Sequence, residues 1–246
     1  MFKISLLICL LFLGVLLAEE NSLEVIPEYA ELAKKRAEAN KDKVVPAEDL
    51  AIMKSGAEKI ALALPSPGLK VGDDAPDFEI KNSDGKMVKL SDRLANGPVV
   101  LCFFRGSWCP YCNMEMQVLS KSLPLFKKLK GQLITISPQL AEKSKDMKEK
   151  FPGAFDILED SDYAVAKNYK VYHDMPEELT ALYKNKFKLD LEEYNGKGRT
   201  ALPVAGTFVI SKEGKIVAAF CDTDYKKRME PQDILMALSK LPKSAK

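Results

Sequence analysis

The stretch from residue 98 to residue 126 constrains the fold of this chain more than any other feature. An apolar run, PVVLCFF (98–104), is followed by Cys109 and Cys112 and then by apolar residues at helical spacing: Met116, Leu119, Leu123 and Phe126. The run predicts a buried strand, and the later pattern predicts an amphipathic helix. The cysteine pair is therefore expected where a strand ends and a helix begins.

This position changes the chemistry of a thiol. The first N–H groups of a helix lack intrahelical partners, and together with the helix dipole they stabilise negative charge. A free cysteine has a pKa near ~8.5, whereas cysteines of Cys-x-x-Cys motifs at helix amino termini reach ~3.5–7.5. The second cysteine, one turn away, can close a disulfide on whatever mixed disulfide or sulfenic acid the first one forms. The motif predicts a reversible dithiol–disulfide couple.

Two other uses of a Cys-x-x-Cys motif compete with a redox role. A structural zinc site needs two more ligands, but Cys102 and Cys221 belong to no second pair, and His173 is the only histidine. A purely structural disulfide stays open, although closing so short a loop stabilises a fold little. The placement between strand and helix favours redox chemistry.

The rest of the chain predicts an α/β fold. After a hairpin with its turn at Asn82–Gly85, strand patterns (98–104, 131–137 and FDILED) alternate with helical ones (after Cys112, 138–151 and YAVAKNY). Two strands, TFVIS and IVAAFC, then form a tight hairpin before a closing helix, PQDILMALSKL. Alternation implies parallel pairing, and the hairpin implies an antiparallel edge. We expect a mixed sheet flanked by helices.

The amino terminus resembles a secretory signal peptide. Lys3 precedes an apolar run that ends at Leu17, and Ala18 occupies the expected cleavage site. We therefore expect a signal peptide at 1–18 and export to a periplasm, an endomembrane lumen or the exterior. An uncleaved anchor is the alternative, because Leu16 is large for its position before the cut.

The mature chain divides at the LPSPG segment. Residues 19–68 are expected to form a helical extension and linker, and 69–246 the principal domain. The 37 basic and 35 acidic residues nearly cancel. The composition therefore offers no patch for nucleic acid and no stable membrane association after signal cleavage.

Several separate stretches resemble one family. LKVGDDAPDFEI, GPVVLCFFRGSWCPYCNMEMQVL, ITISPQ, LPVAGTFVISKEGKI and DTDYKKRMEP are similar to the alkyl hydroperoxide reductase and thiol-specific antioxidant (AhpC/TSA) superfamily, in particular its peroxiredoxin-like branch with a CPYC motif. The resemblance implies a thioredoxin-like fold with an amino-terminal hairpin. It also implies reduction of hydrogen peroxide or organic hydroperoxides, with an external thiol reductant such as thioredoxin and with no metal, haem or flavin.

The resemblance leaves the attacking cysteine open. The peroxiredoxin pattern assigns Cys112 to the peroxide-attacking position, with Glu115 after it, Cys109 in place of a threonine and Arg105 in place of a proline. The thioredoxin analogy assigns Cys109 as the exposed, attacking thiol and Cys112 as the resolving one. We expect Cys109 to exchange with the reductant and leave the peroxide step open.

Departures from the family pattern suggest further roles. Ala205 and Gly206 stand where relatives often have a proline or an arginine, so only Pro203 remains as a substitute for the thioredoxin cis-proline. Arg105 is then the candidate cation for a thiolate or a peroxide oxygen, unless it is an exposed residue with no catalytic role. Trp108 is expected to shield one face of the site.

The remaining candidates are secondary. Cys102 is expected to be an inert buried thiol, and Cys221 is a candidate remote resolving cysteine. The segment 173–199 is a candidate lid or homodimer surface, with a packed insert as the plainer reading. Two other functions stay open beside the peroxidase: a thiol–disulfide oxidoreductase acting on protein disulfides, and a redox-inert thioredoxin-fold interaction module.

Overall fold

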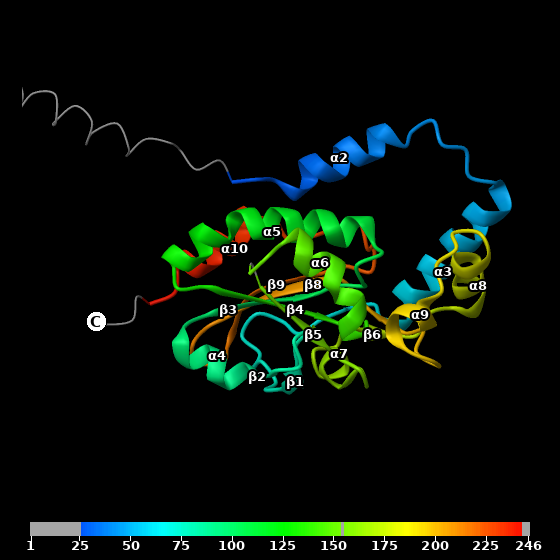
Figure 1. The fold of residues 1–246 in the computed structure, drawn as a ribbon. Coiled ribbons are helices and arrows are strands. Elements are labelled where there is room, and N and C mark those ends of the chain that lie inside the picture. Colours follow the sequence, from blue (N-terminus) through cyan, green and yellow to red (C-terminus); the bar gives the residue numbers. More distant parts are fainter. Residues whose placement is uncertain (1–25, 154, 243–246) are drawn as a thin grey trace, which may run out of the picture.

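A five-stranded mixed sheet forms the centre of the molecule in the computed structural model, which describes residues 26–153 and 155–242 (Figure 1). The strand order is β5-β4-β3-β8-β9. The parallel strands are β3 (Val99–Phe103), β4 (Gln132–Ser137) and β5 (Asp156–Glu159). The antiparallel strands are β8 (Gly206–Ile210) and β9 (Ile216–Cys221). The expected α/β fold, with its parallel pairs and antiparallel edge, is confirmed.

Helices cover both faces of this sheet (Figure 1). One face carries α5 (Pro110–Lys128), α6 (Lys145–Lys150) and α10 (Pro231–Ser239), and the other carries α4 (Leu90–Asn96) and α7 (Ala164–Asn168). Successive side chains of a strand point to opposite faces of the sheet. Because helices cover both faces, the side chains of residues 99–104 in the apolar run are buried on either face. Leu101 and Phe103 enter one core, whereas Cys102 and Phe104 enter the other.

The expected hairpin precedes the sheet. Its strands, β1 (Glu79–Lys81) and β2 (Met87–Lys89), pair antiparallel. The Asn82 Oδ1 atom accepts hydrogen bonds from the backbone N–H groups of Asp84 and Lys86, both at 3.0 Å. This side-chain-to-backbone bonding is the reason why the predicted turn forms at Asn82.

The amino-terminal extension wraps around the end of the domain that carries the cysteines. Helix α2 (Tyr29–Ala39) contacts α5, and α3 (Ala47–Ala63) packs on α8 (Glu177–Asn185) (Figure 1). The predicted signal peptide, 1–18, lies outside the described residues. None of the described helices is both long and apolar enough for a membrane crossing.

The segment 173–199 packs against α3 and contributes to a third core. This core joins α3, α8, α9 (Leu191–Asn195) and β7 (Leu202–Pro203). Strand β7 pairs with the short strand β6 (Tyr172–His173). Leu179 and Leu182 are buried on α8, whereas Phe187 lies beyond its end and is 47% exposed.

The helix expected at 138–151 is shorter than predicted. A 3₁₀ turn, η1 (Ala141–Ser144), leads into α6. Residues before it form a loop because the buried Gln139 side chain donates to Ser144 Oγ at 2.7 Å and accepts from the Ser107 N–H at 2.7 Å. Gln139, at the start of the predicted helix, therefore bonds instead to the loop that precedes the cysteines.

Candidate redox-active site

The loop between β3 and α5 is held in shape by its own backbone and by Gln139. Gly106 has a φ of 153°, and a Cβ atom there would lie 2.3 Å from the Trp108 Nε1 atom. Glycine therefore lets the indole pack directly on the loop backbone. The Asn113 side chain donates to the carbonyls of Ser107, at 2.7 Å, and Cys109, at 3.1 Å. These bonds fix where Cys109 enters the helix.

Cys109 is the N-cap residue of α5, Pro110 is its first helical residue, and Cys112 lies in the first turn. Both cysteines are free thiols. The expectation of an exposed Cys109 is wrong, because only 1% of this residue is accessible. Tyr111 and Tyr225 pack edge to face, 5.6 Å apart, beside it, and Arg105 fills the adjacent space.

Arg105 is a buried cation that faces Cys109. Its Nη1 atom lies 4.0 Å from the Cys109 Sγ atom, and its Nη2 atom donates to the Tyr183 hydroxyl at 2.8 Å. The guanidinium carbon also lies 4.4 Å from the ring centroid of Tyr225 and 4.9 Å from that of Trp108. No carboxylate in the described part of the chain pairs with it. Aromatic rings and the sulfur of Cys109 therefore surround its charge.

The two thiols differ strongly in acidity. The pKa of Cys109 is lowered to about 5, because the hydrogen bond from Cys112 and the charge of Arg105 together outweigh the opposing effect of burial. Burial raises the pKa of Cys112 well above the ordinary value, and its interaction with Cys109 adds to the effect. At neutral pH Cys109 is therefore the thiolate and Cys112 the thiol.

A buried ion pair lies on the other side of Cys112. Arg228 Nε donates to Glu115 Oε2 at 2.6 Å, and both side chains are 1% exposed. Arg228 Nη2 lies 3.5 Å from the Cys112 Sγ atom. Burial raises the pKa of Glu115 to about 7, while Arg228 opposes the rise. This carboxyl group can therefore gain or lose a proton near neutral pH.

The polar contacts continue beneath Glu115. Thr207 Oγ1 lies 3.5 Å from Glu115 Oε1 and 3.7 Å from the Cys102 Sγ atom. Cys102 is fully buried, and this burial raises the pKa of its thiol far above the ordinary value. Its position and protonation agree with the expected inert thiol.

A groove leads from the surface to Cys109. Its lining includes aromatic side chains and cations from four separate segments, and we call it the Cys109 groove; its aromatic residues are Trp108, Tyr111, Tyr183, Phe187, Tyr194 and Tyr225. Trp108 packs edge to face on Tyr183 and on Tyr194, at 6.2 and 6.5 Å between centroids. Trp108 thus forms one side of the groove. Cys112 does not line the groove.

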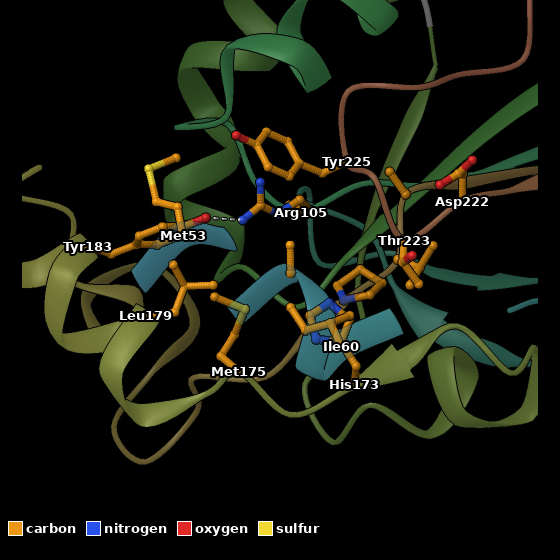
Figure 2. A pocket seen from close by; sticks show the side chains of 14 residues that line it. Met53, Ile60, Arg105, His173, Met175, Leu179, Tyr183, Asp222, Thr223 and Tyr225 are labelled. Carbon is orange, nitrogen blue, oxygen red and sulfur yellow. Dashed lines mark hydrogen bonds between the residues drawn. The ribbon is translucent and has the colours of Figure 1, made fainter. Parts of the chain in front are cut away.

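A smaller pocket shares Arg105, Tyr183 and Tyr225 with the groove but does not reach Cys109. Figure 2 shows the Arg105 guanidinium between Tyr225 and the apolar side chains of α3 and α8. His173, which seemed isolated in the sequence, lines this pocket. Burial lowers its pKa to about 4, so the imidazole is neutral at physiological pH.

The structure brings the five predicted site residues together and adds others. Cys109, Arg105 and Trp108 share the groove, whereas Cys112 and Glu115 meet at Arg228. Sequence reasoning missed Arg228, Tyr183 and Tyr225. For Arg228 and Tyr225 a signal existed, because DTDYKKRMEP belongs to the stretches that carry the family resemblance but received no role.

Two secondary candidates do not reach the site. Cys221 packs against the core on the opposite face of the sheet, and a Cβ on Gly68 or Gly206 would lie 2.5 Å from its Sγ atom. It is therefore separated from Cys109 and Cys112 by the sheet. Pro203 lies in β7, and the described residues contain no cis peptide bond. No cluster of metal-ligating side chains occurs among the residues that the structure describes.

Comparisons with known proteins agree with the fold and with thiol chemistry. The model of the AhpC/TSA family matches residues 71–219. The chain is 32% identical to peroxiredoxin Bcp from Bacillus subtilis over 149 residues. The aligned region covers 61% of this chain and 83% of that protein. It is also 23% identical to the thiol-disulfide oxidoreductase ResA from Bacillus thuringiensis over 164 residues. That alignment covers 66% of this chain and 76% of ResA. A crystal structure of peroxidoxin BcpB from Mycobacterium tuberculosis superposes with a TM-score of 0.55 at 22% identity, covering 71% of this chain and 99% of that one.

Proposed function

Because the chain belongs to the AhpC/TSA family and is a thiol peroxidase or oxidoreductase of the peroxiredoxin kind, we propose that it reduces hydroperoxides through a Cys109–Cys112 dithiol–disulfide cycle. In this proposal Cys109 is the attacking thiolate and Cys112 the resolving thiol. The substrates are hydrogen peroxide or organic hydroperoxides, and an external thiol such as thioredoxin restores the dithiol.

One observation carries the assignment of the two cysteines. Cys109 lines the groove, faces Arg105 and has a pKa lowered to about 5, whereas Cys112 lies behind it and is held protonated by burial. A peroxide reacts with a thiolate and must be able to reach it. Cys109 is both the thiolate and the cysteine that lines the groove, so the thioredoxin-like order of attack is favoured over the alignment with peroxiredoxins.

The chemistry balances with groups that are present. The Cys109 thiolate attacks one peroxide oxygen, the S–O bond forms, the O–O bond breaks, and the leaving alkoxide or hydroxide takes a proton. Cys112 then loses its proton and attacks the sulfenic sulfur, which releases water and forms the disulfide. Two electrons pass from the dithiol to the peroxide, and the external thiol returns them.

Arg228 and Glu115 assist the second step in this proposal. A buried thiol can attack only after it has lost its proton, and burial opposes that loss. Arg228, 3.5 Å from the Cys112 sulfur, stabilises the thiolate as it forms. Glu115, with a pKa raised to about 7, holds Arg228 and is able to take up a proton beside it.

The test is stopped-flow fluorescence of the reduced protein mixed with hydrogen peroxide. Trp108, the single tryptophan, packs on the loop that leads into Cys109 and reports on its oxidation. A second-order change much faster than that of a free thiol supports the peroxidase. A rate no faster than that of a free thiol at equal thiolate concentration overturns it.

A thiol–disulfide oxidoreductase is the second candidate. The similarity to ResA favours it. Two departures from the family pattern do so as well: Cys109 stands in the place of the peroxidase threonine, and Ala205 stands where relatives often have a proline or an arginine. Reduction of insulin by the dithiol form, without turnover of peroxide, would support this function. A Cys109–Cys112 pair that stays oxidised in a strong thiol reductant would instead support the redox-inert module.

Export is part of the proposal. The basic start, the apolar run to Leu17 and the small residue Ala18 support cleavage of residues 1–18. Expression in the source cell, followed by mass spectrometry of the secreted or lumenal protein, tests it. A mature chain that starts near Glu19 supports export, and a chain that retains Met1 in the cytosol contradicts it.

A further inference from the structure

The Cys109 groove is lined by five cations and by no carboxylate. The cations are Arg36, Lys43, Arg105, Lys188 and Lys226. They come from α2 and the loop after it, the loop before α5, the turn after α8 and the loop before α10. The whole chain carries a net charge of only +2, so this concentration of positive charge is local.

None of these five cations pairs with an acidic side chain within residues 26–153 and 155–242. Arg36 lies over the Tyr111 ring at 5.5 Å, Lys226 lies 5.9 Å from the Tyr225 ring, and the Lys188 ammonium donates to the Asn185 carbonyl at 2.9 Å. These contacts position the three cationic side chains but do not neutralise their charge, because the partners are aromatic rings and a backbone carbonyl.

Neighbouring lysines behave differently. Lys184 pairs with Asp190 at 2.6 Å, Lys186 with Glu48 at 3.5 Å and Lys227 with Asp222 at 2.8 Å. Lys188 and Lys226, which lie close to these lysines in the sequence, line the groove and lack such partners in the described part of the chain. Around the groove, these three lysines outside its lining are therefore paired, whereas Lys188 and Lys226 within the lining are not.

Such an arrangement favours a negatively charged ligand. Charges of one sign in a concave site focus the potential and raise the local concentration and association rate of the opposite charge. The groove encloses about 700 Å³, far more than hydrogen peroxide occupies, since a water molecule takes up ~30 Å³. A single carboxylate could pair with only one or two of these cations, which come from four segments. A ligand with several negative charges could pair with all of them.

We propose that the groove receives a polypeptide segment in which acidic residues flank a redox-active cysteine. This inference rests on the proposed function, because the segment belongs to the thiol partner that reduces the oxidised protein. The partner's thiolate attacks the Cys109 sulfur, the Cys109–Cys112 bond breaks, and Cys112 leaves as a thiolate and takes a proton. A second partner thiolate then displaces Cys109, so that the partner dithiol becomes a disulfide and supplies both electrons.

The test uses peptides that carry one cysteine as a mixed disulfide with thionitrobenzoate. Three matched peptides flank the cysteine with Asp and Glu, with Asn and Gln, or with Lys and Arg. Reduced protein attacks the peptide sulfur and releases the coloured thionitrobenzoate. We expect the acidic peptide to react at least about tenfold faster than the neutral one at low salt, and the difference to vanish near 1 M salt, where the screening length falls to ~3 Å.

Matched variants locate the effect. In the triple variant Lys43→Gln, Lys188→Gln, Lys226→Gln, the ratio of acidic to neutral rates should fall close to one. The control triple variant Lys81→Gln, Lys86→Gln, Lys212→Gln removes the same charge outside the groove and should keep the ratio. Equal rates for all three peptides with the unchanged protein, or an equal loss in both variants, would overturn the proposal.

A separate readout distinguishes this proposal from the proposed function. The acidic peptide with its cysteine replaced by serine cannot exchange, so its binding is followed by Trp108 fluorescence. Binding of this peptide at least tenfold tighter than that of its neutral counterpart supports the groove even if the protein proves inert toward peroxides. A protein that reacts with peroxide but binds both peptides equally retains the proposed function and loses this inference.

Discussion

Two arginines lie beside the two cysteines, and they are held in opposite ways. Arg105 faces Cys109 from among aromatic rings and has no acidic partner in the described part of the chain. Arg228 faces Cys112 with Glu115 bonded to it at 2.6 Å. The charge of Arg105 is available to a thiolate, whereas much of the charge of Arg228 is already balanced by a carboxylate.

This difference contributes to the unequal acidity of two cysteines that lie within a motif of only four residues. Both sulfurs are buried, so burial alone would raise both pKa values. A hydrogen bond from the partner thiol, together with the unpaired Arg105 guanidinium, reverses this effect at Cys109. At Cys112 burial prevails, the interaction with Cys109 adds to it, and the paired Arg228 does not overcome them. The arginine environments therefore add to a difference in acidity that burial and the bond between the two thiols already create.

The largest expected effect comes from separating the two cysteines by mutation. Cys109→Ser should lower the rate of reaction with hydrogen peroxide by more than about 10³-fold, because it removes the thiolate that lines the groove. Cys112→Ser should keep the first oxidation but stop at a sulfenic acid, seen by mass spectrometry as one added oxygen trapped by dimedone. If Cys112→Ser is the inactive variant, Cys112 attacks, as the peroxiredoxin alignment has it.

Breaking the ion pair beside Cys112 should have the next largest effect. Glu115→Ala leaves the Arg228 charge buried and unpaired, which costs about 3–5 kcal/mol of unfolding free energy. Urea unfolding measures the loss. Glu142→Ala, at the surface of η1, is the control and should change stability by less than about 0.5 kcal/mol. If both variants lose the same small amount, Glu115 does not stabilise Arg228 as inferred.

Removing the unpaired cation should act on acidity instead. In Arg105→Met the pKa of Cys109 should rise from about 5, because an opposite charge near a thiolate favours the ionised form. A thiol reacts as its thiolate, so alkylation by iodoacetamide should fall by about tenfold near pH 5 and converge with the unchanged protein at high pH. Arg93→Met, whose arginine pairs with Asp156 on another part of the sheet, should leave the alkylation profile in place. An unchanged profile in Arg105→Met would show that Cys112 alone sets the acidity of Cys109.

Local patterns in the sequence were enough to predict the sheet, the hairpin and the position of Cys109 at a helix start, because each depends on neighbouring residues. The helix at 138–151 was predicted too long because Gln139 bonds to Ser107, 32 residues away, which no local pattern reveals. The two arginines show the same limit. Arg105 lies near Cys109 in the sequence and was identified as a candidate, whereas Arg228 reaches Cys112 across 116 residues and was missed. Burial of Cys109 was missed for the same reason, since Tyr225 approaches from a distant loop.

The smallest expected effect tests whether Tyr29 of the amino-terminal extension acts on the Cys112 side of the site alone. Tyr29 of α2 lies over Arg228, with the guanidinium carbon 5.9 Å from its ring centroid, and its hydroxyl donates to the Lys226 carbonyl at 2.6 Å. Tyr29→Phe keeps the ring and removes this bond, so it should cost only about 0.5–1.5 kcal/mol of unfolding free energy.

The alkylation profile of Cys109 should not move in Tyr29→Phe, because the ring stays over Arg228 and Arg105 is untouched. Tyr172→Phe, which removes a hydroxyl bonded to Asp174 at an exposed position, is the matched control and should cost less. A shift of the Cys109 titration in Tyr29→Phe would mean that the surroundings of the two arginines are coupled. The acidity of each thiol would then depend on Arg105, Arg228 and the extension together. It would not be set by the neighbouring arginine separately.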